Sequence, residues 1–147
     1  MSSEIDIIES LAQLSTLAVK QSQTVADRVG IHPIDLESVE WLMRNPGATA
    51  GALGKAMGLT SGAVTGLLRR LTAHGFIQTR PDDLDGRKLR IYCKSKKISL
   101  RISPHYESII QRTKILMANY KTKELSVVAR FLGEICSLEE ADPAVSE

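Results

Sequence analysis

The 147-residue sequence predicts a mainly α-helical fold that carries one small β-hairpin. Apolar residues recur at three- and four-residue steps through most of the chain, which is the spacing of amphipathic helices. Two short helical segments are joined by a turn that contains Gly58, and such a turn is typical of a helix-turn-helix. Two alternating segments then flank the turn-forming stretch PDDLDG, which predicts a hairpin, or wing, beside the helix-turn-helix.

The longest predicted helices stand at the two ends of the chain. Residues 3–29 contain no proline or glycine and therefore predict one helix. Two further helices are predicted over about 104–121 and 122–138, and residues 139–147 form a frayed acidic tail. The apolar seams of the first and last helices are formed by Ile7, Leu11, Leu14, Ala18 and Val25, and by Leu125, Val128, Leu132 and Ile135. A core of about sixty residues is too small to cover both seams, so they predict that two copies of the chain dimerise.

Shorter elements are predicted in the middle of the chain, where start and stop signals are dense. Thr49 is suited to cap a short helix that ends at Gly58, and the next helix opens at Thr60. Residues 94–103 are ambiguous between strand, loop and the start of a helix. Residues 33–94 thus form the helix-turn-helix core of one domain that spans the chain. The predicted elements of this core are a helix from about His32-Pro33 to the breaker at 45–47, a helix over 50–57, a helix from Thr60-Ser61 to His74-Gly75, and strands over 76–80 and 87–92.

Charge is segregated along the chain, although its net value is only +2. Residues 51–101 hold eleven Lys and Arg against three Asp and Glu. The flanking residues are acidic, with three basic against seven acidic groups in 1–50 and five against seven in 102–147. A basic middle segment indicates a polyanionic partner such as nucleic acid, and the alternative is a basic face that is merely solvated.

Several classes of function lack support in the sequence. No phosphate-binding glycine loop, zinc-protease motif or nucleophile-elbow motif occurs, so we do not expect an enzyme. Cys93 and Cys136 are too far apart for a CxxC pair, and the three histidines are scattered, so no metal or other cofactor is expected. No apolar run is long enough to span a bilayer and no signal-peptide pattern is present, which predicts a cytoplasmic protein without a membrane partner.

The helix predicted from Thr60-Ser61 to His74-Gly75 carries two glycines on its outer face, although each costs about 1 kcal/mol relative to alanine within a helix. In a helix-turn-helix, the second helix enters the major groove of DNA, where a glycine lets the backbone come close to bases and phosphates. The alternatives are close helix packing for the glycines and helix capping for the first hydroxyl residues. The polar side that would contact DNA consists of Thr60, Ser61, Gly62, Thr65, Gly66 and Arg69.

The segment TAGALGKAMGLTSGAVTGLLRRLTAHGFIQTRPDDLDGRKLRIY resembles the winged helix-turn-helix core of MarR-type transcriptional regulators. The resemblance rests on the G-F-I-x-x-R exit from the second helix and on Asp85-x-Arg87 in the wing, and it extends weakly over most of the chain. It implies a homodimer that binds double-stranded DNA, with Arg87 at the wing tip near the minor groove and oriented by an ion pair with Asp85. The residues that it places in the major groove are Ser61, Gly62, Thr65 and Arg69.

The resemblance also implies a small phenolic or lipophilic effector, bound between the DNA-binding and dimer regions. Trp41, Met43 and Met117 are candidates to line its pocket, and the alternative for each is a place in the core. Two further basic residues of the hairpin, Arg80 and Lys88, are expected to contact DNA.

The sequence departs from the family pattern in two places. The segment CKSKKISLRIS replaces an L-T-x-x-G segment, and many members have a basic or polar residue where Gly66 stands.

From the helix-turn-helix, the charge pattern and the resemblance together, we predict a homodimeric transcriptional repressor or activator that binds a pseudo-palindromic operator. The alternatives are a winged-helix protein-interaction module and a thiol-based redox sensor that uses Cys93, whose pKa the neighbouring lysines would lower.

Overall fold

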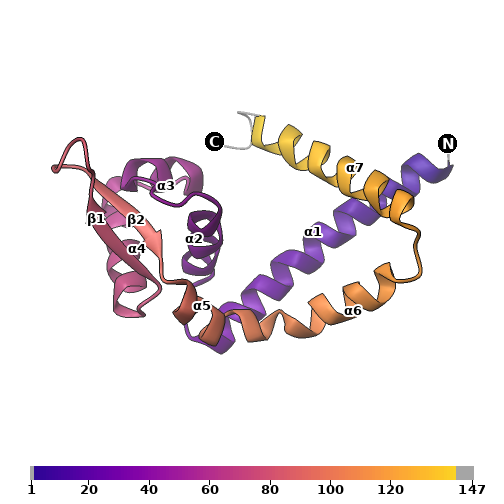
Figure 1. Ribbon diagram of the computed structural model, residues 1–147, viewed down its shortest axis with the longest axis horizontal. Helices are drawn as coiled ribbons and strands as arrows, with labels where there is room; N and C mark the ends of the chain where they lie inside the picture. Colours follow the sequence, from indigo (N-terminus) through magenta and orange to yellow (C-terminus); the bar gives the residue numbers. More distant parts are fainter. Residues whose placement is uncertain (1, 142–147) are drawn as a thin grey trace. The chain divides into compact units, whose positions relative to one another are not determined.

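The computed structural model describes residues 2–141 and divides the chain into two compact units, Met1–Ile102 and Ser103–Glu147. Both units are mainly helical, and the first carries a β-hairpin, so the predicted fold class is confirmed (Figure 1). The first unit contains α1 (Ser2–Val29), α2 (Pro33–Arg44), α3 (Ala50–Met57), α4 (Ser61–Ala73), β1 (Ile77–Pro81), β2 (Leu89–Cys93) and α5 (Ser95–Arg101). The second unit contains a 3₁₀ turn, η1 (Ser103–His105), followed by α6 (Glu107–Met117) and α7 (Thr122–Ala141).

The helix-turn-helix is built by local signals in the sequence. The Oγ1 atom of Thr49 accepts a hydrogen bond from the N–H of Ala52 at 3.1 Å, which caps α3 as predicted. Gly58 ends α3 with a left-handed φ of 63°, a conformation that favours glycine. Two residues later, the Oγ1 atom of Thr60 accepts from the N–H of Ala63 at 3.3 Å and caps α4. The turn between the two helices therefore has little freedom.

The core of the first unit lies where α2, α3 and α4 meet the hairpin (Figure 1). The C-terminal part of α1 joins this core, because Val25 and Ala26 are 2% and 0% exposed. Val25 is therefore a core residue and not part of the predicted dimer seam. The other fully buried apolar side chains include Leu36, Leu42, Leu53, Leu67, Leu71, Phe76, Ile77 and Ile91.

An isolated antiparallel β-bridge between Ala48 and Ile91 joins the hairpin to the loop before α3. Strands β1 and β2 pair antiparallel, with Thr79 opposite Ile91. The N–H of Gly47 donates to the carbonyl of Ile91, and the N–H of Ile91 donates to the carbonyl of Ala48, both at 2.9 Å. A Cβ on Gly47 would stand 3.2 Å from the hydroxyl of Tyr92, so the loop passes close to β2. These contacts fix the base of the wing beside the helix-turn-helix.

Some predicted boundaries differ from the structure, and the segment that was ambiguous in the sequence is assigned by it. Arg87 and Lys88 belong to the turn and not to the returning strand, because the N–H of Lys88 donates to the carbonyl of Asp85 at 2.9 Å and β2 starts at Leu89. The ambiguous residues 94–103 contain α5. The helix predicted over 104–121 is instead a 3₁₀ turn followed by the shorter α6, since the N–H of Tyr106 bonds to the carbonyl three residues before it.

The last helix is longer than predicted. Helix α7 continues to Ala141, so the first residues of the predicted acidic tail are helical. Residues 142–147, the rest of that tail, lie outside the described residues. Within residues 2–141, no helix combines the length and the apolar character that crossing a membrane requires.

Candidate nucleic-acid interface

Helix α4 separates an apolar face from a polar face. Val64, Leu67 and Leu71 are buried against the rest of the first unit. The opposite side exposes Ser61, Gly62, Thr65 and Arg69 and leaves Gly66 half-buried. The structure therefore brings these residues together on one surface, as the spacing predicted.

The two glycines on this surface do not serve helix packing. A Cβ on Gly62 would meet no atom within 4 Å, and a Cβ on Gly66 would meet only the Nη1 atom of Arg70, at 3.7 Å. By contrast, a Cβ on Gly54 would lie 2.9 Å from the Cγ2 atom of Val64, so Gly54 lets α3 and α4 approach each other. The packing alternative is therefore wrong for Gly62 and Gly66. Gly54 is therefore the glycine that serves helix packing. A glycine inside the short α3 lowers the stability of that helix, and this is the feature of the sequence that could have indicated a close contact at Gly54.

The hydroxyl groups near the start of α4 have different roles in the folded chain. Thr60 is the N-cap, so its capping alternative is confirmed. The Oγ1 atom of Thr65 donates to the carbonyl of Ser61 at 3.0 Å, and the two lone pairs of this oxygen can still accept hydrogen bonds. Both Ser61 and Thr65 are exposed. This end of α4 thus presents hydroxyl groups and glycine backbone without bulky side chains.

The wing tip is held by two aspartates. One carboxylate oxygen of Asp82, Oδ1, accepts hydrogen bonds from the N–H groups of Leu84 and Asp85 at 2.8 and 3.4 Å. Its other oxygen, Oδ2, accepts from the Nε atom of Arg90 at 2.5 Å. The Leu84 and Arg90 hydrogen bonds lower the pKa of Asp82. The Asp82 carboxylate therefore stays ionised at neutral pH, and its hydrogen bond with Arg90 ties the turn to β2.

The predicted ion pair between Asp85 and Arg87 is absent from the described residues. The Oδ1 atom of Asp85 accepts instead from the backbone N–H of Arg87 at 3.1 Å. Asp85 therefore shapes the turn, and the exposed guanidinium of Arg87 is not fixed by it. The physical reason is distance along the chain: a residue two positions away in a tight turn offers its N–H to the carboxylate more readily than its long side chain.

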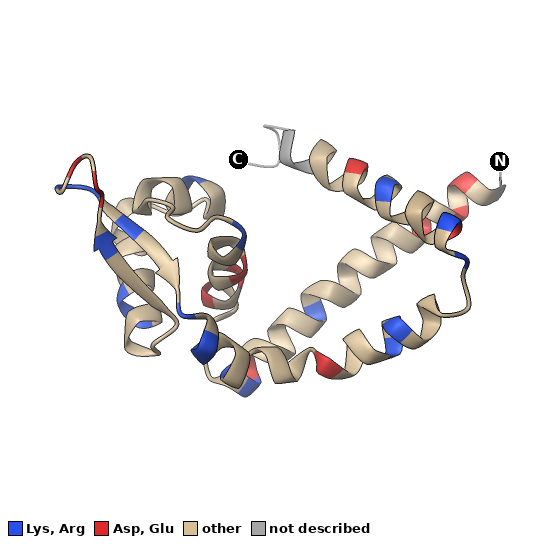
Figure 2. Ribbon diagram, viewed as in Figure 1, with Lys and Arg blue, Asp and Glu red and all other residues tan. Residues whose placement is uncertain are grey.

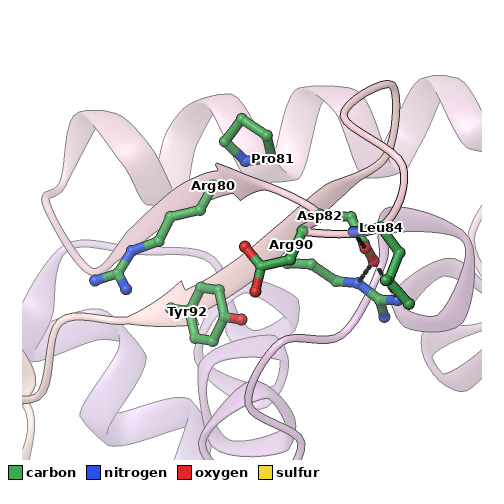
Figure 3. A pocket seen from close by; sticks show the side chains of 7 residues that line it. Arg80, Pro81, Asp82, Leu84, Arg90 and Tyr92 are labelled. Carbon is green, nitrogen blue, oxygen red and sulfur yellow. Dashed lines mark hydrogen bonds and ion pairs between the residues drawn. The ribbon is translucent and has the colours of Figure 1, made fainter.

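The cross-strand pair Arg80 and Arg90 points its two charges apart (Figure 3). The guanidinium of Arg80 lies over the ring of Tyr92, with 5.1 Å between its carbon and the ring centroid. Arg90 points the other way, toward Asp82, and its Nη1 atom also donates to the carbonyl of Gly47 at 3.3 Å. A hollow of about 680 Å³ opens along this side of the hairpin. Arg80 therefore remains an exposed cation, whereas Arg90 holds the wing to the loop before α3.

The charges of the first unit are distributed unevenly (Figure 2). Basic residues are frequent on the hairpin, α4 and α5, whereas acidic residues lie mainly on α1, α2 and the wing tip (Figure 2). Two of the cations are engaged within the chain, because Arg70 pairs with Asp35 and Arg90 pairs with Asp82. Sequence reasoning missed both pairs. Asp35 carried a usable signal, since it occupies an inward position of α2 where a charge needs a partner.

Cys93 lies in an environment unlike that of a reactive thiol. Burial raises the pKa of the Cys93 thiol, and its Sγ atom contacts the carbonyl of Val39 at 3.8 Å. The proposed lowering of this pKa by the neighbouring lysines is therefore wrong, because the desolvation of the thiolate outweighs them. Among residues 2–141, no group of three or more His, Cys, Asp or Glu side chains could hold a metal ion.

The candidate effector residues belong to different units of the chain, and none of the three is buried. Met43 and Met117 are 53% and 40% exposed, so the alternative that they are plain core residues is wrong for both. Trp41 is half-buried on α2. Met117 ends α6 in the second unit.

The seams predicted to form a dimer are largely uncovered in the isolated chain. On α1, Ile7 and Leu14 are 45% and 58% exposed, Ala18 is exposed and Leu11 is half-buried. On α7, Val128 and Leu132 are also exposed, and Leu125 and Ile135 are half-buried. The same helices expose further apolar side chains at Ile5, Ile8, Leu17, Val127 and Phe131.

Known proteins match both the sequence and the fold. A family model described as MarR family matches residues 29–88. The HTH-type transcriptional regulator YcgE of Bacillus subtilis, itself uncharacterized, is 31% identical over 137 residues, which are 92% of this chain and 87% of that protein. A crystal structure of a MepR mutant from a multidrug-resistant S. aureus clinical isolate has a TM-score of 0.73 at 19% identity and covers 88% of this chain and 95% of its own. An S. aureus MepR mutant bound to an oligodeoxyribonucleotide has a TM-score of 0.59 at 20% identity and covers 88% and 96% of the two chains.

The helix-turn-helix and the adjoining wing define the class as a winged helix-turn-helix protein. The chain belongs to the MarR family of transcriptional regulators. Members of this family are regulators and not enzymes, so family membership confirms the prediction that this protein is not an enzyme.

Proposed function

We propose that this regulator binds double-stranded DNA sequence-specifically, as a homodimer, at a pseudo-palindromic operator. The observation that carries the proposal is the outer face of α4, where nothing packs on Gly62 and the side chains of Ser61, Thr65 and Arg69 are exposed. The solved complex of an S. aureus MepR mutant with an oligodeoxyribonucleotide supports the same use of this fold.

The start of α4 would enter the major groove. Gly62 and Gly66 allow the helix backbone to approach the DNA, and Ser61 and Thr65 offer hydroxyl oxygens to base edges or phosphates. Arg69 lies on the same face two turns further along and can reach a guanine or a phosphate. Thr60 serves mainly through its cap, which fixes where the helix begins.

The wing would supply the second contact with each half-site. Arg87 and Lys88 are exposed at the turn, and the exposed Arg80 is held over Tyr92. We propose that Arg87 lies near the minor groove and that the other two cations contact phosphates. Asp85 would act by shaping the turn through the N–H of Arg87.

The exposed seams of α1 and α7 support the homodimer. Single exposed apolar residues are common on protein surfaces, but α1 and α7 each expose several apolar side chains close together in sequence. Covering them with a second copy would place two α4 helices in successive major grooves, about 34 Å apart on one face of the duplex.

A small lipophilic or phenolic effector, acting in the cytoplasm, remains part of the proposal. Trp41 is the chain's one tryptophan and is half-buried, so its fluorescence would report a ligand that binds near α2. Met43 and Met117 are exposed apolar side chains that a ligand or a partner subunit could cover.

Selection of bound sequences from random duplex DNA by the purified protein tests the function. A pseudo-palindromic consensus with half-sites about one helical turn apart is the expected result. Recovery of no consensus, together with binding of an acidic protein, would favour the winged-helix protein-interaction module instead.

We expect Arg87→Ala to weaken binding to the selected operator by about ten- to a hundredfold, since each dimer loses two wing contacts. Folding should be unaffected because the side chain is exposed at the turn. Asp85→Ala should weaken binding less, by loosening the turn. The measurement is a mobility-shift titration, with Arg28→Ala on the exposed side of α1 as the matched arginine control. Normal binding by Arg87→Ala would mean that the wing does not contact DNA.

We expect peroxide or diamide to leave DNA binding largely unchanged. The raised pKa of Cys93 keeps its thiol protonated and slow to react at neutral pH. The check is an operator titration before and after oxidant, together with the rate at which iodoacetamide labels Cys93 in native and denatured protein. A loss of binding that dithiothreitol reverses and that Cys93→Ser abolishes would establish the redox sensor instead.

A further inference from the structure

A buried carboxylate on α2 binds a side chain of α4, the helix that we propose enters the major groove (the recognition helix). The side chain of Asp35 is 1% exposed, although it carries a charge that burial disfavours. The guanidinium of Arg70 on α4 binds it through two hydrogen bonds, from Nε to Oδ2 at 2.9 Å and from Nη2 to Oδ1 at 2.6 Å. This fork geometry fixes both the position and the plane of the guanidinium.

The two nitrogens used by Asp35 leave the third nitrogen of Arg70 on another side. The Nη1 atom would stand 3.7 Å from a Cβ on Gly66, one turn earlier on α4. Gly66 has no side chain, so this edge of the guanidinium is open toward the outer face of the helix. Consistent with this, the Arg70 side chain is 40% exposed while its partner Asp35 is buried.

We propose that Arg70 is a further DNA-contact residue, whose Nη1 atom donates to a phosphate oxygen of the operator while Asp35 positions it. The inference rests on the proposed function and extends it to Arg70. The ion pair with Asp35 alone would suggest that Arg70 only holds α4 to α2. It also gives Gly66 a specific role: a larger side chain there would cover the Nη1 edge.

A phosphate is favoured over a base for geometric reasons. Arg70 follows Gly62 by eight residues, or about 12 Å along the helix axis, whereas the first turns of a recognition helix approach the base edges. Held by Asp35, the guanidinium cannot extend into the groove floor as a free arginine would. A single outward N–H is sufficient for a phosphate oxygen, and its orientation before binding reduces the conformational entropy lost on association.

Neutralisation of single operator phosphates tests the proposal. Methylphosphonate would replace each phosphate of the selected duplex in turn, and binding would be measured for the wild type and for Asp35→Asn/Arg70→Gln. The paired substitution leaves no buried charge alone, so the fold should survive, which a urea titration checks. We expect one phosphate in each half-site whose neutralisation weakens the wild type about tenfold and leaves the variant unaffected.

A second variant covers the case in which the pair variant does not fold. Arg70→Lys keeps a cation on Asp35 but lacks a separate nitrogen on the Gly66 side, so it should lose sensitivity to the same phosphate. If every phosphate matters equally to the wild type and to the folded variants, Arg70 only joins α4 to α2 and the proposal is overturned.

Arg69→Ala separates the failure of this inference from failure of the proposed function. Arg69 is the neighbouring arginine without a buried partner in the described chain, and it lies on the exposed face. Weaker binding by Arg69→Ala, together with an unchanged phosphate profile in the Arg70 variants, would leave the function standing and remove only the role of Arg70. A wild type that selects no duplex would remove both.

Discussion

The affinity for the selected duplex is expected to fall by about 10³ to 10⁵ between roughly 50 and 200 mM salt. The physical cause is the release of counterions from the phosphates that lysine and arginine neutralise. The segment 51–101 holds eleven such cations against three carboxylates. A dimer that contacts about six to ten phosphates would produce a fall of this size.

The structure narrows the set of cations that can contribute. Arg90 is paired with Asp82, and Arg101 donates to the carbonyl of Val29 at 3.1 Å. Arg70 is paired with Asp35 and keeps only its Nη1 edge for a phosphate. The exposed cations that remain in the segment are Lys55, Arg69, Arg80, Arg87, Lys88, Lys94, Lys96 and Lys97. Eight such groups per chain are enough to account for the expected salt dependence even if only half of them reach DNA.

Fluorescence anisotropy across a salt series measures this dependence. The slope of log K against log salt should become shallower by about one for each phosphate contact removed, so Lys88→Ala should flatten it while Arg28→Ala should not. A flat response of the wild type would indicate that the basic surface meets a protein partner and not a polyanion.

Local signals explain why much of the fold could be predicted from the sequence. Thr49, Gly58 and Thr60 act on backbone groups within four residues of themselves, so their roles follow from spacing alone. The exposed face of α4 also follows from spacing, because a helix with a continuous apolar stripe leaves its other side outward.

The pairing of charges could not be predicted in the same way. Arg69 and Arg70 are adjacent and chemically identical, and only the position of α2 decides that the second binds Asp35. Similarly, the turn between the strands contains three aspartates, and the strand register decides that Asp82 receives Arg90. Such pairs join residues from different elements, whose relative placement periodicity does not specify.

The apolar seam of α1 also shows that periodicity does not specify which neighbour an apolar side chain packs against. Ile7, Leu14 and Val25 share a single heptad-like pattern, but the first two are exposed and Val25 is buried in the core of the first unit. Deletion of residues 1–28 would therefore remove core residues as well as a dimer surface. A single substitution on the exposed part of α1 is the cleaner test.

We expect Leu14→Glu to convert the protein to a monomer and to weaken binding to the palindromic operator by about 10² to 10⁴. Leu14 is 58% exposed in the isolated chain, so the new charge is harmless in a monomer. In a dimer it would be buried against apolar side chains, and each subunit would contribute one such charge. Once the subunits separate, the second half-site no longer gains from the high effective concentration that a linked partner provides.

Light scattering and operator titration, made on the same samples, measure both effects. Gln13→Glu adds the same charge at the neighbouring exposed position, and it should remain a dimer with unchanged affinity if the seam is specific. Circular dichroism of both variants should retain the helical signal, because the core of the first unit is untouched. An intact wild type that is a clean monomer at micromolar concentration and still binds the palindrome tightly would exclude dimerisation through α1 and α7, since one recognition helix would then suffice for the affinity.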